Sequence, residues 1–306
     1  MTRDSLPLTQ KQNTSMILEV VTATLVVFLL VIPTAGQSSG RPQEQNPPQS
    51  ENPPDADLIN PDRPGIADGS NVIGAKRVQI ETGLQEEFRR DGHSREHTIF
   101  IPALIRVGID NDWEVRIEGN TFTRVVTFDP TDVASQSSGF APVSLGIKYH
   151  IYDFKGGHQA SLGTIVRVFP AWGSEDFRTH HVTGDVRLAL DWDFSQRLKL
   201  SLNPNVGVGR YEDDQGRMFT SGLLAVTLNY LPTKKLNPFI DVGLQTPEKS
   251  EGRSSVILDT GVAYIIGRNL QLDASVGTGT HGDTTPHPFI AFGISFRSKV
   301  WDKERH

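Results

Sequence analysis

The sequence predicts an all-β fold: a transmembrane, antiparallel, up-and-down β-barrel of about twelve strands, preceded by a signal peptide and a disordered Pro/Gln-rich linker. Three observations predict it. From residue 75 onward, apolar and polar residues alternate in runs that are mostly ten or more residues long. The connections between these runs alternate between short and long. Aromatic residues gather at the strand ends beside the short connections.

The composition agrees with this class and excludes several others. The chain has 306 residues, a net charge of −6 and no cysteine. It therefore lacks the basic excess of nucleic-acid-binding proteins, and disulfides and thiolate metal sites are excluded. Hydrophobic residues make up 37% of the chain, which is low for a helical membrane protein but suits a barrel with a polar interior.

The N-terminal residues 1–36 have the order of a secretory signal peptide. Arg3 and Lys11 precede an apolar run over residues 20–32, which a proline and small residues follow. That run is about 13 residues long, whereas a helix needs about 20 residues to cross a bilayer. The alternative is an uncleaved anchoring helix that starts at Met16.

The next segments lead from a polar tract into the barrel. Residues 37–60 are rich in Pro, Gln, Asn and Ser and nearly free of large apolar side chains, so we expect a disordered linker. Residues 61–74 form a stiff lead-in segment, because its two prolines restrict the backbone and remove hydrogen-bond donors. We expect the barrel over residues 75–297 and a C-terminal tail over 298–306.

The strands follow from alternation with a period of two, which gives each strand one apolar face and one polar face. Residues 113–118 (WEVRIE) are an example. The expected lengths exceed the five or six residues common in globular proteins and suit tilted membrane-spanning strands. The expected strands are 76–88, 97–109, 112–124, 141–152, 158–170, 181–194, 197–210, 218–230, 236–245, 255–266, 269–279 and 287–297.

The connections alternate in length in the way that outer-membrane barrels arrange periplasmic turns and extracellular loops. A soluble sandwich has no reason to sort its loops like this. The short connections are 110–112, 153–157, 195–197, 232–235 and 267–269. The connections that are mostly longer are 89–96, 125–140, 171–180, 211–217, 246–254 and 280–286.

Amphipathic aromatic rings are typical of the membrane–water boundary. Their placement beside the short connections predicts a girdle on the periplasmic side. We therefore expect a bacterial outer-membrane protein whose N- and C-termini are both periplasmic. The expected girdle residues are Trp113, Tyr149, Tyr152, Phe154, Trp192, Phe194, Tyr230 and Tyr264.

The lead-in and the first strand resemble the start of the family named for the MetA pathway of phenol degradation. The matching positions are Asp62, Arg63, Pro64, Gly74, Gln79, Ile80, Glu81 and Gly83. The resemblance implies an outer-membrane barrel transporter for passive uptake of small solutes, with hydrophobic or aromatic ones among the candidates. The implied partners are outer-membrane lipid, a small-molecule solute and the barrel assembly machinery.

The lead-in motif Asp62, Arg63 and Pro64 has two interpretations. The segment lies rigidly along the periplasmic rim, or it enters the barrel mouth and Arg63 pairs with a carboxylate of the lumen. Pro-Gly turns need no function, which favours the first interpretation.

Charged residues on the inward face of the strands are the candidate site. Both signs occur at similar frequency, so they can pair across a lumen narrower than that of larger porins and form a small-solute channel or a gated path. They can equally be the solvated filling of a sealed structural or surface-interaction barrel without transport. The main candidates are Glu81, Arg106, Glu114, Arg116, Glu118, Lys148, Arg167, Asp185, Arg187, Asp191 and Asp259. Further inward candidates are Arg124, Asp193, Lys199, Asp241 and Asp273.

No catalytic residue, cofactor or metal ligand is assigned. Asp191 and Asp193 lie two apart on one strand face, which alternation alone explains. The one Gly-x-Ser-x-Gly match, residues 36–40 (GQSSG), lies where the expected signal peptide meets the polar linker, without the strand and helix that a nucleophile elbow needs. The sequence has no phosphate-binding Walker motif, so an enzyme is not expected. Histidines beside the long connections could share a metal or sense protons, although polar loops commonly contain histidine. These are His93, His97, His180, His181, His281 and His287.

Overall fold

The computed structural model describes most of the chain from residue 58 onward. The expected signal peptide and all but the end of the linker lie outside the described residues, as does most of the C-terminal tail. The described residues contain no long apolar helix of the kind that crosses a bilayer. The described ranges are 58–91, 94–129, 133–154, 159–282 and 285–299.

Antiparallel β-strands account for nearly all the regular structure of these ranges. Their order along the chain is also their order around the sheet, apart from the short β4. The strands are β1 Arg77–Asp91, β2 Ser94–Gly108, β3 Trp113–Phe128, β4 Val133–Gly139, β5 Ser144–Phe154, β6 Ala160–Phe169, β7 Thr183–Ser195, β8 Leu200–Glu212, β9 Met218–Tyr230, β10 Leu236–Thr246, β11 Ser255–Ile266, β12 Leu270–His281 and β13 Phe289–Lys299.

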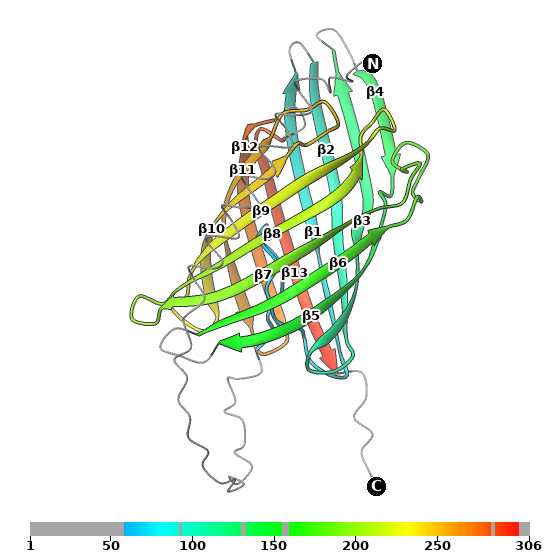
Figure 1. Ribbon diagram of the computed structural model, residues 1–306. Helices are drawn as coiled ribbons and strands as arrows, with labels where there is room; N and C mark the ends of the chain where they lie inside the picture. Colours follow the sequence, from blue (N-terminus) through cyan, green and yellow to red (C-terminus); the bar gives the residue numbers. More distant parts are fainter. Residues whose placement is uncertain (1–57, 92–93, 130–132, 155–158, 283–284, 300–306) are drawn as a thin grey trace, which may run out of the picture.

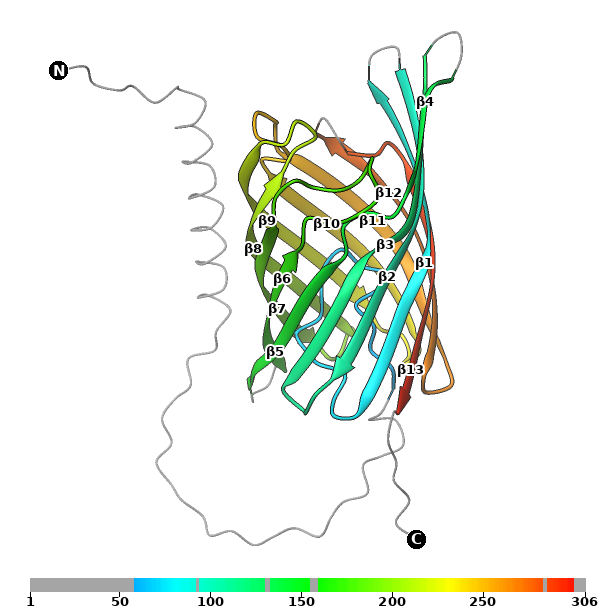
Figure 2. The same cartoon turned by 90° about the vertical axis from the view of Figure 1, so that its right-hand side faces the viewer.

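The sheet closes on itself because β1 pairs with β13 along its length, with Gly83 opposite Gly293. Within the described ranges twelve strands form this closed barrel, and β4 pairs only with the outer part of β3. Figures 1 and 2 show the closed wall, with β4 at its upper end. The predicted all-β, twelve-stranded antiparallel barrel is confirmed.

The structure differs from the prediction at the long-loop end of the first strands. β4 lies inside the segment 125–140 that was predicted as a loop. The expected loop 89–96 is instead mostly paired strand, since β1 and β2 continue to the register pair Asp91 and Ser94. These extensions carry polar residues on both faces, so alternation does not reveal them.

The barrel is apolar outside and polar inside, the reverse of a soluble protein. Large apolar side chains on the outer face are 36–62% exposed. They include Ile80, Ile105, Ile117, Leu145, Ile147, Val166, Leu228, Ile240, Val242, Leu258, Leu272, Val276, Ile290, Phe292 and Ile294. Buried charged and polar side chains line the interior, including Gln79, Glu81, Arg106, Glu114, Arg116, Lys148, Arg167, Asp185, Asp241, Asp259 and Asp273.

Aromatic rings lie in pairs at the short-turn end of the barrel. Trp113 and Tyr149 are register partners, and their ring centroids are 4.4 Å apart. Tyr230 and Tyr264 are about half exposed, at 48% and 50%. These residues end the apolar belt on that side.

The described chain before β1 lies inside the barrel. We call residues 58–74 the inner segment, which appears in blue within the lumen in Figure 2. It forms no strand. Gly74 at its end has a φ of 83°, in the left-handed region that glycine adopts without strain, and the chain turns there into β1.

Candidate functional site

The inner segment is a loop that enters the lumen and returns at the same end. At its start, the Ile59 N–H donates to the Arg268 carbonyl in the short turn between β11 and β12, at 2.8 Å. Just after it, the Lys76 N–H donates to the Gly108 carbonyl at the end of β2, at 3.2 Å. Both contacts lie at the short-turn end, so the segment can leave the lumen without threading through the barrel.

Asp62 anchors the segment to the barrel wall. Its carboxylate lies 2.5 Å from Arg116 Nη1 and 2.8 Å from Lys148 Nζ, and 3.6 Å from Arg106 Nη1. All three cations are at most 1% exposed. Burial raises the pKa of the Asp62 carboxyl, but Arg106, Lys148 and Arg116 outweigh burial, so its pKa lies well below the usual value.

Arg63 anchors the inner segment to the other side of the barrel wall. Its Nη2 lies 3.2 Å from Asp273 Oδ1 on β12, and its backbone N–H donates to Glu81 on β1 at 3.0 Å. The guanidinium fits there because Gly83 and Gly293 face it: a Cβ at Gly83 would lie 2.9 Å from Arg63 Nη2. The structure therefore agrees with the second interpretation of the lead-in, in which Arg63 pairs with a lumen carboxylate.

Wall side chains also satisfy the backbone of the segment, which has no strand partner for its N–H groups. The carboxylate or amide oxygens accept backbone N–H groups at 2.8–3.0 Å. The pairs are Ile66 with Asp241, Asp68 with Asn205, Ser70 with Asp191, and Ile73 with Glu114. Ion pairs and these side-chain contacts, and not a ladder of strand pairing, hold the segment in place.

The two walls of the lumen differ in charge. Strands β10, β11 and β12 contain no lysine or arginine and contribute the buried acids Asp241, Asp259 and Asp273. Strands β2, β3, β5, β6 and β7 contribute the cations Arg106, Arg116, Lys148, Arg167 and Arg187, with acids among them. The inner segment matches this separation, since Asp62 and Asp68 face the cations and Arg63 faces an acid.

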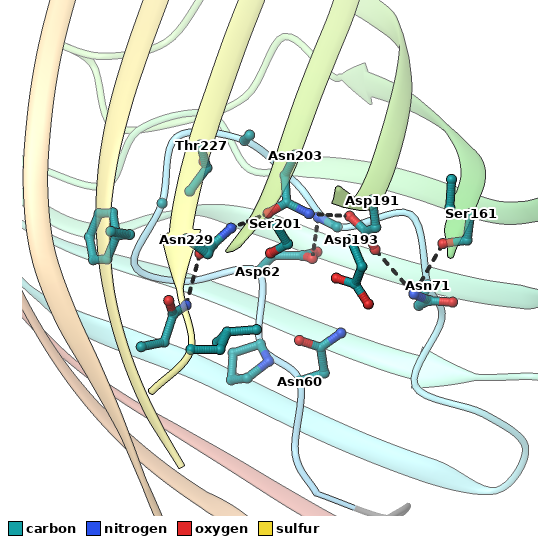
Figure 3. A pocket seen from close by; sticks show the side chains of 18 of the residues that line it. Asn60, Asp62, Asn71, Ser161, Asp191, Asp193, Ser201, Asn203, Thr227 and Asn229 are labelled. Carbon is teal, nitrogen blue, oxygen red and sulfur yellow. Dashed lines mark hydrogen bonds between the residues drawn. The ribbon is translucent and has the colours of Figure 1, made fainter. Parts of the chain in front are cut away.

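The inner segment separates two cavities. The larger, of about 750 Å³, lies toward the short turns, and Figure 3 shows its polar lining. The smaller, of about 340 Å³, lies toward the long loops and includes Leu104, Ile257, Phe289 and Ala291 in its lining. Residues 62–65 line both cavities.

Asp191 is the centre of the hydrogen bonds in the larger cavity (Figure 3). Its carboxylate accepts from Asn203 Nδ2 at 2.5 Å, from Asn71 Nδ2 at 3.1 Å and from Ser70 Oγ at 2.8 Å. Asp193 lines the same cavity. The two carboxylates lie in an amide-rich lining that can hold a polar solute.

Other inward candidates form ion pairs within the wall. Arg167 pairs with Glu118 at 2.9 Å and with Asp185 at 2.7 Å. Arg187 reaches Asp68 of the inner segment at 3.3 Å. Asp259 is 5% exposed and lies opposite Asp241 in the strand register.

Two of the further candidates do not face the lumen. Arg124 is exposed, because a bulge between β2 and β3 shifts the alternation before it, and it bonds to Gln136. Lys199 is exposed in the turn before β8, with a φ of 56°. The interpretation of these two residues as inward-facing is wrong.

Sequence reasoning missed the polar, uncharged part of the site, including Ser70, Asn71, Asn203 and Asn205. Asn203 and Asn205 occupy inward positions by the same alternation that revealed the charged candidates. The need of a proline-rich segment for hydrogen-bond acceptors was the signal that could have singled them out.

The histidines beside the long connections were considered as a shared site without being assigned to one. His180 and His181 both contact Glu212, at 2.8 and 3.0 Å. His93 lies outside the described residues. Among the residues that the structure describes, no group of three or more His, Asp or Glu side chains is arranged to hold a metal ion.

Comparison with known proteins gives a family and a fold. The family described as "Putative MetA-pathway of phenol degradation" matches residues 61–297. An outer membrane channel from Pseudomonas putida F1 is similar in structure, with a TM-score of 0.58, 11% identity, and coverage of 78% of this chain and 100% of that chain.

The β domain of the Bordetella autotransporter BrkA gives a TM-score of 0.45 at 15% identity, over 72% of this chain and 99% of that one. No curated protein sequence matches significantly.

Proposed function

The chain belongs to the MetA-pathway of phenol degradation family, and on that premise we propose that it is an outer-membrane channel for the passive uptake of small solutes. The fold supports this proposal, because a closed barrel with an apolar outer face and a polar interior suits a membrane pore. The solved relative of similar fold is itself an outer membrane channel.

The position of the inner segment between two cavities is the observation that carries the proposal. The segment separates a cavity of about 750 Å³ from one of about 340 Å³, and both are large enough for small organic molecules. Since side-chain contacts hold it and both of its ends lie at one mouth, its withdrawal joins the two cavities. The channel is therefore closed by its own inner segment and opens when that segment moves.

The asymmetry of the connections gives the orientation that we propose. The short turns and both termini face the periplasm, and the long loops face the exterior. The apolar belt contacts outer-membrane lipid, and the barrel assembly machinery inserts the chain. The aromatic pairs near the short turns lie at the periplasmic boundary.

The alternative is a sealed barrel with a structural or surface-interaction role. The ion pairing of the inner segment favours this alternative, because Asp62, Arg63 and Asp68 all have charged partners on the wall in the closed lumen. We assign no catalysis to the lumen, since Asp191 and its neighbours bond to amides and hydroxyls of the inner segment and the wall.

Single-channel recording of the full-length protein in planar bilayers tests the proposal. The wild type is expected to open rarely. Asp62→Asn removes the charge that pairs with Arg116 and Lys148, so the open fraction is expected to rise at least about tenfold, the effect of about 1.4 kcal/mol. Asp176→Asn, which removes an exposed acid in a long loop, is the matched control and is expected to behave like the wild type.

Silence of both the wild type and Asp62→Asn, in protein that still shifts its gel mobility on heating, would sink the channel proposal. The sealed barrel would then be the better account.

A further inference from the structure

The cations around Asp62 differ in which hydrogen bonds they retain when the inner segment leaves the lumen. Arg106 is held by the wall itself, since its Nε and Nη2 lie 2.7 and 3.0 Å from Glu114 and its Nη1 lies 3.1 Å from Glu81. Withdrawal of the segment leaves these contacts intact.

Arg116 and Lys148 depend on the inner segment. Arg116 bonds to Asp62 at 2.5 Å and to Asp68 at 3.0 Å, both on the segment. Its nearest wall carboxylates are farther, at 3.7 and 3.9 Å. Within the described chain, Lys148 Nζ has its hydrogen bonds only with the Asp62 carboxylate and the Asn71 carbonyl, again on the segment. An open lumen therefore contains two neighbouring cations that have lost their closest anion, and Arg116 keeps only the longer ion pairs with the wall, at 3.7 and 3.9 Å.

Two such cations in a confined lumen form an anion site. A guanidinium and an ammonium can each donate to one carboxylate, as they do now to Asp62. Leaving them unpaired costs free energy, since both side chains are at most 1% exposed in the closed state. A solute that supplies a carboxylate removes this cost.

The smaller cavity supplies the surroundings for the rest of such a solute. Arg116 lines it together with Leu104, Ile257, Phe289 and Ala291. These apolar residues can hold a hydrocarbon body beside Arg116, in a lining that also contains charged residues such as Glu81, Glu118 and Asp259.

We propose that Arg116 and Lys148 form a carboxylate subsite, which Asp62 occupies in the closed channel as an internal substitute for the solute. The solutes are small monocarboxylates with an apolar body. This inference rests on the proposed function, because it names the solute class of that channel. The carboxylate binds only after Asp62 leaves, so it shifts the population toward the open state.

Uptake by proteoliposomes tests the subsite in the full-length protein. Benzoate and benzamide are the probes, because they have nearly the same size and differ in charge. In Asp62→Asn the subsite is vacant. We expect the ratio of benzoate to benzamide uptake in this variant to be at least about five, the lower end of common coupling effects. In Asp62→Asn with Lys148→Met, the ratio is expected to fall to about one.

Lys235→Met in the same background is the matched control. Lys235 is exposed in a short turn, so removal of its charge is expected to leave the ratio unchanged. Arg116→Gln in that background is a second test of the subsite. Heat-modifiable gel mobility shows that the barrel is folded in each variant, and uptake of both probes is measured as the excess over protein-free liposomes.

The outcomes separate this inference from the proposed function. Uptake of both probes at a ratio that Lys148→Met does not lower overturns the carboxylate subsite and leaves the channel standing. Failure of Asp62→Asn to pass either probe or any ion overturns the channel, and the subsite with it.

Discussion

At the scale of single residues, the inner segment is held by charges that match the wall they meet. Asp62 lies against Arg116 and Lys148, and Arg63 pairs with Asp273 across the lumen. Neighbouring residues of opposite charge thus reach opposite sides of the barrel.

The contribution of Asp62 to closure is expected to be independent of pH over the range from 7 to 4.5. Because the pKa of Asp62 is lowered in the folded protein, its contribution is complete above the ordinary carboxyl value of about 3.9 and is lost only as pH falls through the lower value. The ratio of open fractions between Asp62→Asn and the wild type should therefore be equal at both pH values. A ratio that approaches one at pH 4.5 would contradict this expectation.

The partner of Arg63 shows what the sequence could not provide at this scale. Alternation predicts several inward acids, including Asp241, Asp259 and Asp273, and gives no means of choosing among them. The choice depends on where an irregular segment crosses the lumen, and only the fold fixes that path.

At the scale of the elements, the strands could be predicted wherever they cross the apolar belt. One face contacts the belt and the other the lumen, so a period of two is imposed on the sequence. Beyond the belt this constraint ends. β4 and the outer parts of β1 and β2 therefore lacked the pattern, although they are paired strands.

The inward candidate residues were predicted from the same alternation, and the prediction was wrong where a bulge interrupts it. The inward residues of β3 between Glu114 and Glu118 line the lumen, and Arg116 among them contacts the inner segment. After the bulge the parity reverses, and Arg124 points outward. A bulge depends on pairing between two strands, so a single strand sequence does not reveal it.

The fit of the inner segment against β6 gives a prediction for an element. A Cβ at Gly163 would lie 3.1 Å from both the Cα and the carbonyl carbon of Ser70, in addition to a closer contact with its oxygen. Gly163→Val should displace the segment and raise the open fraction in bilayers, while the barrel still shows heat-modifiable gel mobility. Gly222→Val on β9 is the control, because a Cβ there meets no atom closer than 3.7 Å. Equal open fractions in both variants would argue against close packing of the segment on β6.

At the scale of the whole molecule, the proposed contact between the outer face and lipid predicts where an added charge lowers stability most. Val242 is 42% exposed at the middle of β10, with Leu258 and Val226 as register neighbours. The apolar belt therefore continues across three adjacent strands at this level.

Val242→Arg is expected to lower the free energy of unfolding in lipid vesicles by about 2–4 kcal/mol, the cost of a cation near the centre of the bilayer. Leu198→Arg, in the short turn before β8, should cost no more than about 1 kcal/mol, because it lies near the membrane boundary. Urea titration of both variants measures the difference. Equal losses would place the belt elsewhere on the barrel.

The ion pair between Arg63 and Asp273 also has a consequence for the order of assembly. The two residues are 210 positions apart, and the binding surface of the inner segment includes strands from β1 to β12. Contacts between such distant parts of a chain are slow to form, because closing the long loop between them costs entropy first. Because its partners lie on strands from β1 to β12, we expect the first described segment of the chain to dock only after the wall has formed. Docking of the segment marks a finished barrel.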